Sequence, residues 1–228
     1  MKQFIKSMPV IGSVASQLWR GLKPPRPFSG STDYWMVRYK LGGSSGDGSR
    51  DRLAEFKAEV VNGFVLSNDV DRVIEYGSGD GNQLKLANYR DYLGFDVSPE
   101  AIAMCRKMFH GDEGKHFKLV SEYAGETAPL TLSLDVIFHL VEDEVFAAYM
   151  ERLFDSSTHF VVIYSSNYEG DADDGAAHVR HRMFSRWIDE HRPHWRLLAH
   201  VPNRYPYTGD TRTSSFSDFF IYAKPVRE

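Results

Sequence analysis

The spacing of apolar residues alternates along the chain between the period of a helix and that of a strand. Residues 49–69 carry apolar side chains at helical spacing, namely Leu53, Phe56, Val60, Val61, Phe64 and Val65. This spacing predicts an amphipathic helix. Short runs rich in β-branched and aromatic residues then alternate with further helical runs. The predicted strands cover residues 72–77, 92–98, 116–121, 132–140, 158–167, 195–202 and 217–224, and the predicted helices cover residues 82–88, 98–109, 142–155 and 181–192.

Single helices between successive strands imply parallel pairing through right-handed crossovers. Residues 203–215, between the last two predicted strands, carry no helical pattern. Those two strands are therefore expected to pair antiparallel at one edge of the sheet. The sequence predicts an α/β protein with a Rossmann-like, doubly wound, mostly parallel sheet and an antiparallel final strand pair.

The N-terminal residues 1–30 form a basic, apolar extension with no acidic residue. Their apolar side chains recur at roughly helical spacing, as in a segment that rests on an anionic membrane surface. The alternative is an extension packed on its own domain or on a second subunit. Pro9 and Gly12 interrupt the apolar centre, so a cleaved signal peptide is not expected.

Two further segments follow the extension. Residues 31–50 are aromatic in their first half and rich in Gly and Ser in their second half, which predicts a lid-like segment with a mobile loop. Residues 51–228 carry the α/β domain.

Composition narrows the class of protein. The chain has 228 residues, a formal net charge of -4 and one cysteine, Cys105. Nucleic-acid binding is not expected because such proteins usually carry a broad basic face. No apolar run is long enough for a membrane span. A lone cysteine fits a cytoplasmic protein, peripheral at the inner face of a membrane if residues 1–30 bind there.

Three glycines, Gly77, Gly79 and Gly81, follow the first predicted strand in the stretch VIEYGSGDGNQ. In an open parallel sheet, ligands bind beyond the carboxyl ends of the strands, where the strand order reverses. The dinucleotide fingerprint G-x-G-x-x-G fails because Asn82 occupies the position of its last glycine. The phosphate-loop pattern fails as well, since no Lys-Ser or Lys-Thr pair follows.

Two carboxylates accompany this loop. Asp96, at the end of the next predicted strand, can accept hydrogen bonds from both hydroxyls of a ribose. Glu75, at the tip of the first strand, lies where a cationic group of a ligand would sit. An acidic loop repels a pyrophosphate and suits a ligand with an amino group and a sulfonium.

With these residues, the sequence resembles the class I S-adenosylmethionine (SAM)-dependent methyltransferases over residues 53–224. VIEYGSGDG is similar to their first motif, YLGFDVS to their second and LSLDVIFHLVEDEVF to their fourth. The resemblance implies SAM as the cofactor. It places the methionine part at the glycine backbone, the amino group near Glu75, the ribose at Asp96 and the adenine beside Val97. The cofactor-binding residues that it implies are Glu75, Gly77, Ser78, Gly79, Asp96, Val97, Glu122 and His139.

The third motif of that family, a polar residue near the adenine amine, is weakly marked. Ser121, Glu122 and Tyr123 are the alternatives.

His139 is the candidate general base for a methyl transfer, because it follows the strand motif at the ligand end and its ordinary pKa suits proton transfer. The alternative is a histidine that shapes the pocket without moving a proton.

Two other clusters are candidates for acceptor binding. His178, Arg180 and His181 follow an acidic stretch and suit a phosphate or carboxylate; their spacing matches no known metal motif, so no metal is expected. Tyr34, Arg38 and Tyr39 could close over the cofactor or stack on a sugar ring. The alternatives are a solvated loop and ordinary core packing.

The stretches SLDVIFHLVED, YSSN, HVRHR and NRYPY together resemble bacterial methyltransferases found with polysaccharide-building enzymes. We therefore expect a methyltransferase that O-methylates a saccharide, a glycan phosphate or another small polar acceptor. N-methylation of a small molecule or protein, and a non-catalytic cofactor-binding or scaffold subunit, are the alternatives.

Overall fold

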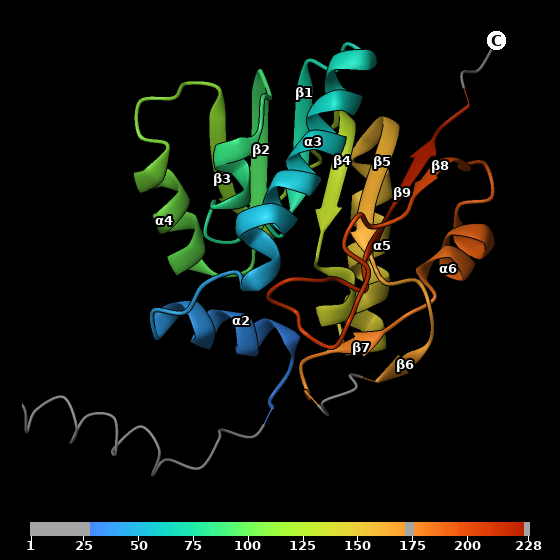
Figure 1. The fold of residues 1–228 in the computed structure, drawn as a ribbon. Helices are drawn as coiled ribbons and strands as arrows, with labels where there is room; N and C mark the ends of the chain where they lie inside the picture. The colour runs from blue at the N-terminus through green and yellow to red at the C-terminus, as the bar shows by residue number, and fades with distance from the viewer. Residues whose placement is uncertain (1–27, 172–175, 226–228) are drawn as a thin grey trace, which may run out of the picture.

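The computed structural model describes residues 28–171 and 176–225 (Figure 1). The predicted membrane contact rests on residues 1–30, which lie almost entirely outside the described residues. Asp173 and Asp174, in the acidic stretch before the histidine-arginine cluster, also lie outside them. None of the helices in the described ranges is long and apolar enough to cross a membrane.

Seven strands form one sheet (Figure 1). They are β1 (Arg72–Tyr76), β2 (Asp91–Asp96), β3 (Lys115–Leu119), β4 (Ala128–Leu134), β5 (Ser157–Ser165), β8 (Arg196–Val201) and β9 (Asp218–Ala223). Their order is β3-β2-β1-β4-β5-β9-β8, in which β1 to β5 pair parallel and β9 pairs antiparallel with both β5 and β8. The predicted Rossmann-like sheet with an antiparallel final pair is confirmed. The strand order reverses between β1 and β4.

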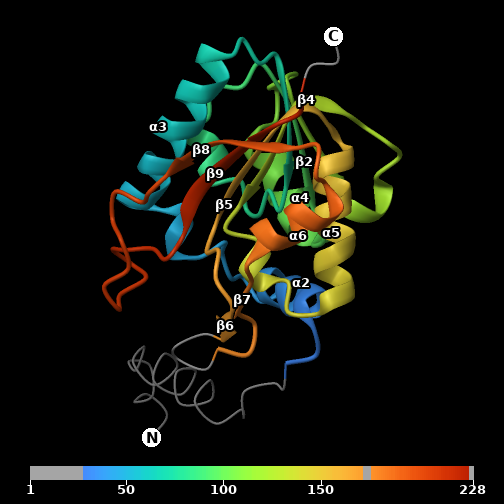
Figure 2. The ribbon, with the colours of Figure 1, turned by 90° about the vertical axis from the view of Figure 1, so that its right-hand side faces the viewer.

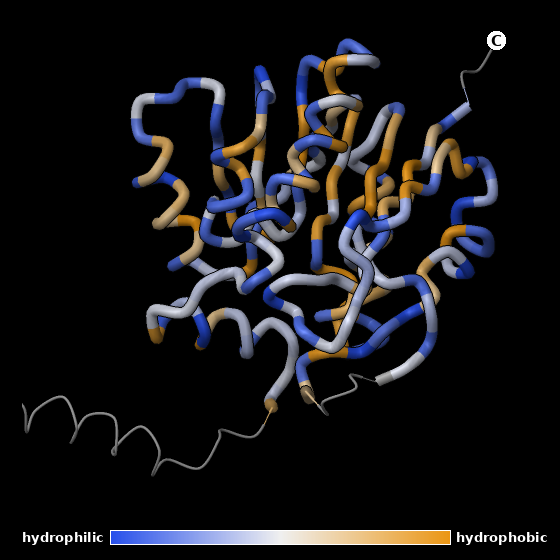
Figure 3. The backbone as a smooth tube through the Cα atoms, viewed as in Figure 1, coloured by the Kyte–Doolittle hydropathy of each residue, from blue (hydrophilic) through white to orange (hydrophobic). Residues whose placement is uncertain are grey.

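Helices cover both faces of this sheet because the side chains of its central strands point to alternate faces. The helices on these faces are α3 (Asp51–Ser67), α4 (Pro99–Met108), α5 (Asp143–Asp155) and α6 (Phe184–His191), while α2 (Ser31–Lys40) lies at one edge (Figure 1). Val73 of β1 belongs to a core cluster with Phe56 of α3, to which α4 also contributes. Ile74 belongs to the opposite cluster, with Met150 of α5 and Ile188 of α6. Figure 2 shows α3 on one side of the sheet and α5 and α6 on the other, and Figure 3 shows hydrophobic stretches concentrated in the strands.

The predicted start of the helix over residues 98–109 is confirmed in detail. Ser98 is the N-cap of α4, where its hydroxyl accepts a hydrogen bond from the Ala101 N–H at 3.3 Å, and Pro99 is the first helical residue. This satisfies one of the donors that a helix start leaves free.

The predicted strand over residues 132–140 is wrong in its second half. β4 ends at Leu134 because Asp135 adopts a φ of 59°, far from the negative φ values of β-strands. A 3-10 helix, η4 (Ile137–His139), follows. The helix predicted over residues 82–88 is likewise a short 3-10 helix, η2 (Gln83–Leu86).

The carboxyl ends of β1, β2 and β4 lie at the edge of the sheet over which α2 runs (Figure 1). The start of α2 is bound there to the segment after η4. The Ser31 N–H donates a hydrogen bond to the Glu142 carboxylate at 2.8 Å, and the Ser31 hydroxyl donates another at 2.5 Å. A small two-stranded sheet, β6 (Gly170–Asp171) and β7 (Arg180–His181), lies at the same edge. The fold therefore encloses the switch point of the sheet on the ligand side.

Candidate functional site

Two cavities lie next to each other at the carboxyl edge of the sheet. The sequence resemblance implies a cofactor beside the glycine loop, so the cavity there is called the donor-side cavity and its neighbour the acceptor-side cavity. The donor-side cavity, of about 400 Å³, is lined by the glycine loop after β1, the end of β2 and the segment after β4. The acceptor-side cavity, of about 300 Å³, is lined by residues of the loop after α2, of the β7 region and of the loop before β9. Trp35, Ser45, Asp135 and His139 line both cavities. These four residues therefore mark the junction between the two.

The glycine loop is a tight turn that only glycine fits without strain. Gly77 and Gly79 have φ values of 88° and 59°. A Cβ at Gly77 would lie 2.4 Å from a Val136 methyl carbon, and one at Gly79 would lie 2.3 Å from the Ser45 hydroxyl. The loop is held against β2, since the Gly77 N–H donates to the Phe95 carbonyl at 2.7 Å. The turn thus brings bare backbone to the wall of the donor-side cavity.

Asp96 is buried and lines this cavity. One carboxylate oxygen accepts the Gly79 N–H and the other accepts the Ser98 N–H, both at 2.9 Å. Burial raises the pKa of Asp96, and the backbone hydrogen bonds oppose that rise. Hydrogen bonds donated by a ligand would favour its charged form further.

Glu75 lies buried in the same cavity wall. Burial raises the pKa of Glu75 to about 7, while a 2.6 Å hydrogen bond from the Tyr92 hydroxyl and the charge of Lys57 act to lower it. A positively charged ligand group beside Glu75 would shift this carboxyl to its ionised form.

Two buried polar atoms of the donor-side cavity lack a hydrogen-bond partner within the part of the chain that the structure describes. They are the hydroxyl of Ser78 and the side-chain oxygen of Gln83. An unpaired buried polar group costs about 1–3 kcal/mol. A polar ligand would repay this cost, so the cavity has the chemistry of a ligand site.

The loop after α2 closes over the glycine turn through Ser45. The Ser45 N–H donates to Asp80, and the Asp80 N–H donates to the Ser45 hydroxyl, both at 3.0 Å. The Tyr39 hydroxyl lies 2.9 Å from the same serine oxygen. The aromatic segment predicted to be lid-like thus contacts the predicted ligand loop directly.

Glu122 is the predicted cofactor-binding residue that the structure does not bring to the cavity. Its carboxylate turns back to accept the Leu119 N–H at 2.7 Å. Val120 lines the cavity instead, as does Val97.

His139 lies on η4 at the junction. Its Nδ1 is 3.1 Å from the His178 carbonyl, which requires Nδ1 to carry the hydrogen. Its ring meets Trp35 edge to face, with centroids 4.9 Å apart. Burial lowers the pKa of His139 to about 3, so the ring is neutral near pH 7 and Nε2 is an acceptor.

Several aromatic rings line the acceptor-side cavity, together with polar and small residues. Its rings include Trp35, Phe138, Tyr207 and Phe216. Two of the predicted substrate-binding histidines, His178 and His181, also line it.

The predicted aromatic lid residues divide between the two cavities. Tyr39 lines the donor-side cavity and Arg38 the acceptor-side cavity. Tyr34 stacks on His178 with ring centroids 4.2 Å apart, and its hydroxyl accepts a hydrogen bond from Arg38 at 3.0 Å. Tyr34 therefore supports the cavity wall from behind.

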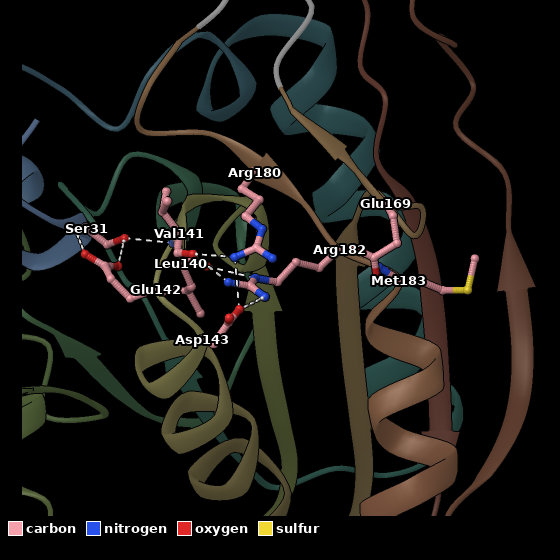
Figure 4. Close-up of polar contacts among 9 residues, drawn as sticks. All are labelled: Ser31, Leu140, Val141, Glu142, Asp143, Glu169, Arg180, Arg182 and Met183. Atoms are coloured by element: carbon pink, nitrogen blue, oxygen red, sulfur yellow. Dashed lines mark hydrogen bonds and ion pairs between the residues drawn. The ribbon is translucent and has the colours of Figure 1, made fainter.

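The arginines of the HVRHR stretch were predicted to bind an anionic ligand, but their partners lie within the protein. Arg180 and Arg182 converge on the Asp143 carboxylate at 2.9 Å and 2.7 Å (Figure 4). Both also donate to the Val141 carbonyl, and Arg182 to the Leu140 carbonyl. Neither arginine lines the donor-side or the acceptor-side cavity. Their charges hold the segment after η4 in place.

Lys57 and Asp135 are site residues that the sequence analysis missed. Lys57 comes from the middle of α3, and its Nζ lies 2.7 Å from the Asp135 carboxylate. Both line the donor-side cavity. A lysine on the apolar side of a predicted amphipathic helix was the available signal, because a charge there needs a partner.

No model of a known protein family matches the chain, and no curated protein matches its sequence. Solved structures do match it. The N-methyltransferase NodS from Bradyrhizobium japonicum WM9, in complex with S-adenosyl-L-homocysteine (SAH), is 11% identical over 87% of this chain and 100% of that chain, with a TM-score of 0.64.

Two other solved structures are similar in the same way. The methyltransferase domain of bacterial CtHen1 is 16% identical over 75% of this chain and 97% of that chain, with a TM-score of 0.58. Magnesium protoporphyrin IX methyltransferase from Synechocystis PCC 6803 with bound SAM is 12% identical over 93% of this chain and 92% of that chain, with a TM-score of 0.55. The protein described above has the fold of class I SAM-dependent methyltransferases, as the resemblance predicts.

The strain that a side chain at Gly77 would cause can be measured as a loss of stability. Replacing Gly77 with Ala places a Cβ against Val136 at a positive φ, and we expect the free energy of unfolding to fall by about 1–3 kcal/mol. The matched control is Gly63→Ala in α3, where a Cβ meets nothing within 4 Å. That change is expected to stabilise the protein by about 0.5–1 kcal/mol. Urea unfolding measures both, and equal effects would contradict the strained turn.

Proposed function

We propose that this protein is a SAM-dependent methyltransferase. The observation that carries the proposal is the donor-side cavity at the switch point of the sheet. Positive-φ glycines form part of its wall, and it contains the buried carboxylates of Glu75 and Asp96. Polar atoms of Ser78 and Gln83 lack partners there among the described residues.

The residues of this cavity suit the parts of SAM. Glu75 would receive the amino group. Asp96 would accept hydrogen bonds from the ribose hydroxyls, and Val97 and Val120 offer apolar surface for the adenine. When bound, SAM supplies a methyl group made electrophilic by a sulfonium.

For the acceptor we propose a saccharide or another small polyhydroxylated molecule that is methylated on oxygen. Rings such as Trp35 and Phe216 in the acceptor-side cavity suit the flat faces of a sugar. Arg38 is the only Lys or Arg among the described residues that line it, and it is bound to the Ser44 carbonyl and to Tyr34. A neutral glycan therefore suits this cavity better than a phosphorylated one.

His139 is proposed to accept the proton of the reacting hydroxyl at Nε2. A base with a low pKa suffices here, because the hydroxyl becomes a strong acid as its oxygen gains the methyl group. Bound SAM would supply the methyl group: transfer of that group to the acceptor oxygen would break its bond to sulfur and leave a neutral thioether, while His139 takes the hydroxyl proton. The hydrogen bond from Nδ1 to the His178 carbonyl keeps Nε2 available.

The compartment and pathway form part of the same proposal. A single buried cysteine, Cys105, suits a reducing cytoplasm. The sequence resemblance to methyltransferases found with polysaccharide-building enzymes supports a role in polysaccharide biosynthesis.

Binding of SAH tests the donor site. Asp96→Ala removes a charged acceptor worth about 1.5–3 kcal/mol per hydrogen bond, so we expect SAH affinity to fall at least about tenfold. The control is Asp91→Ala at the opposite end of β2, where the side chain is exposed beside Arg72. Its SAH affinity should match that of the wild type. Calorimetry measures the SAH affinity of the wild type and of both variants. Absence of binding to the wild type at millimolar SAH would contradict the proposal.

Glu75 makes SAH affinity depend on pH. Its pKa of about 7 lies above the ordinary value of 4.5, so its contribution to stability is complete below about pH 4.5 and is lost as pH rises through 7. A ligand ammonium needs the ionised carboxylate, so SAH affinity should rise by more than about tenfold from pH 5.5 to 7.5. Glu75→Gln should flatten this dependence. Calorimetry in buffers of different ionisation enthalpy should also show that SAH binding releases a proton. If SAH affinity depends on pH equally in Glu75→Gln and in the wild type, Glu75 does not have this role.

His139→Ala tests the acceptor chemistry. Wild-type protein, SAM and a panel of methyl pyranosides and amino sugars are incubated, and mass spectrometry identifies the methylated atom. We expect O-methylation, with kcat lowered about a hundredfold or more in the variant and SAH affinity little changed. Because His139 is neutral above about pH 3, kcat should not fall between pH 8 and 5 through this residue. Unchanged kcat would exclude it as the base, and N-methylated products would favour the alternative.

A further inference from the structure

Asp135 is the carboxylate at the junction of the two cavities. It follows the last residue of β4 and lines both the donor-side and the acceptor-side cavity. Its side chain keeps 20% of its surface exposed, whereas the side chain of Lys57, its partner, keeps 1%. Part of the Asp135 side chain therefore remains accessible at the point where the two cavities meet.

The backbone of Asp135 is held in a conformation that few non-glycine residues adopt. Its φ is 59°, and its N–H donates to the Tyr164 carbonyl at 2.9 Å. A residue in this region costs about 1–3 kcal/mol and persists where its surroundings enforce it, most often at functional sites. The loop after α2 also closes against it, because a Cβ at Gly48 would lie 2.9 Å from an Asp135 oxygen.

The carboxylate is oriented from two sides. One oxygen lies 2.7 Å from Lys57 Nζ, and the other accepts the Ser217 hydroxyl at 3.2 Å. Lys57 also lies 5.4 Å from the centre of the Tyr164 ring. Replacing a buried ion pair by apolar residues is often neutral or stabilising, so stability alone does not account for this pair.

Asp135 and His139 place two hydrogen-bond acceptors on the same junction. An ionised carboxylate has only acceptors, and His139 offers Nε2 because Nδ1 donates to the His178 carbonyl. Because both residues line the same two cavities, one ligand that satisfies both acceptors needs two donors. Neighbouring hydroxyls of a sugar ring supply them, whereas an isolated hydroxyl supplies one.

We propose that the acceptor is a vicinal diol and that Asp135 binds the hydroxyl next to the one that is methylated. The reacting hydroxyl donates its proton to His139 Nε2, and its neighbour donates a hydrogen bond to Asp135. Lys57 is a positioning residue that acts through Asp135. This inference rests on the proposed methyltransferase activity and names the substrate class of that site.

The test compares kcat/KM for two substrates with the wild type and with one variant. The substrates are the methyl pyranoside with the highest wild-type turnover and its analogue that lacks the hydroxyl next to the methylated one. The variant is Asp135→Asn, because asparagine tolerates the same backbone conformation. With the diol, kcat/KM should fall about tenfold or more, the worth of a charged hydrogen bond. With the deoxy analogue, the variant and the wild type should be nearly equal.

Two further variants separate recognition from folding. Asp135→Asn leaves Lys57 without its anion, so urea unfolding is measured alongside, and Lys57→Met/Asp135→Asn removes the unpaired charge. The double variant should recover stability and still fail to discriminate the diol from the deoxy analogue. Lys57→Met alone should also reduce this discrimination, which a purely structural role would leave unchanged. Asp69→Asn is the matched control, since Asp69 has a φ of 47° on an exposed turn.

The outcomes distinguish this inference from the proposed function. If Asp135→Asn lowers kcat/KM equally for both substrates, or leaves the diol unaffected, the inference is overturned while the methyltransferase activity stands. If the wild type binds no SAH and methylates no compound of the panel, the proposed function fails, and this inference fails with it.

Discussion

The ion pair between Lys57 and Asp135 connects the elements on which the site depends. It joins the middle of α3 to the end of β4 at 2.7 Å, and the Ser217 hydroxyl adds the start of β9. The positive φ of Asp135 ends β4 and turns the chain into η4, which carries His139. Asp135 lines both cavities, and Lys57 lines the donor-side cavity. The residue that follows a core strand thus also carries the carboxylate at the junction of the two cavities.

A second set of charges acts on the other side of the junction. Arg180 and Arg182 bind Asp143 and the carbonyls before it, while Ser31 binds the adjacent Glu142 (Figure 4). The short segment after η4 is therefore held from both sides, by β7 and by α2. Because these arginines are used within the protein, Arg38 is the only lysine or arginine among the described residues that line the acceptor-side cavity. This cavity therefore offers an anion less positive charge than the sequence suggested.

Much of the fold and of the donor side could be predicted because those features are local. Strand and helix periods, the N-cap at Ser98 and the glycines after β1 are properties of short stretches. The carboxyl ends of neighbouring parallel strands share one edge, so Asp96 and the glycine loop were expected together. The 2.9 Å hydrogen bond from the Gly79 N–H to Asp96 joins them. The end of β4 was misplaced because an apolar run continues through Ile137 and Phe138, and apolarity alone does not reveal a backbone reversal.

The sequence by itself determined the Rossmann-like sheet, the position of the glycine turn and the two carboxylates that accompany it, since each follows from residue type and local spacing. Only the tertiary structure decided which charges remain available to a ligand. Arg180 and Glu122 are bound within the protein, whereas Asp135, paired with Lys57 from a distant segment, keeps part of its side chain exposed at the junction of the cavities. The physical reason is that a charged side chain binds the nearest complementary group in space, and sequence spacing does not specify that distance across a fold.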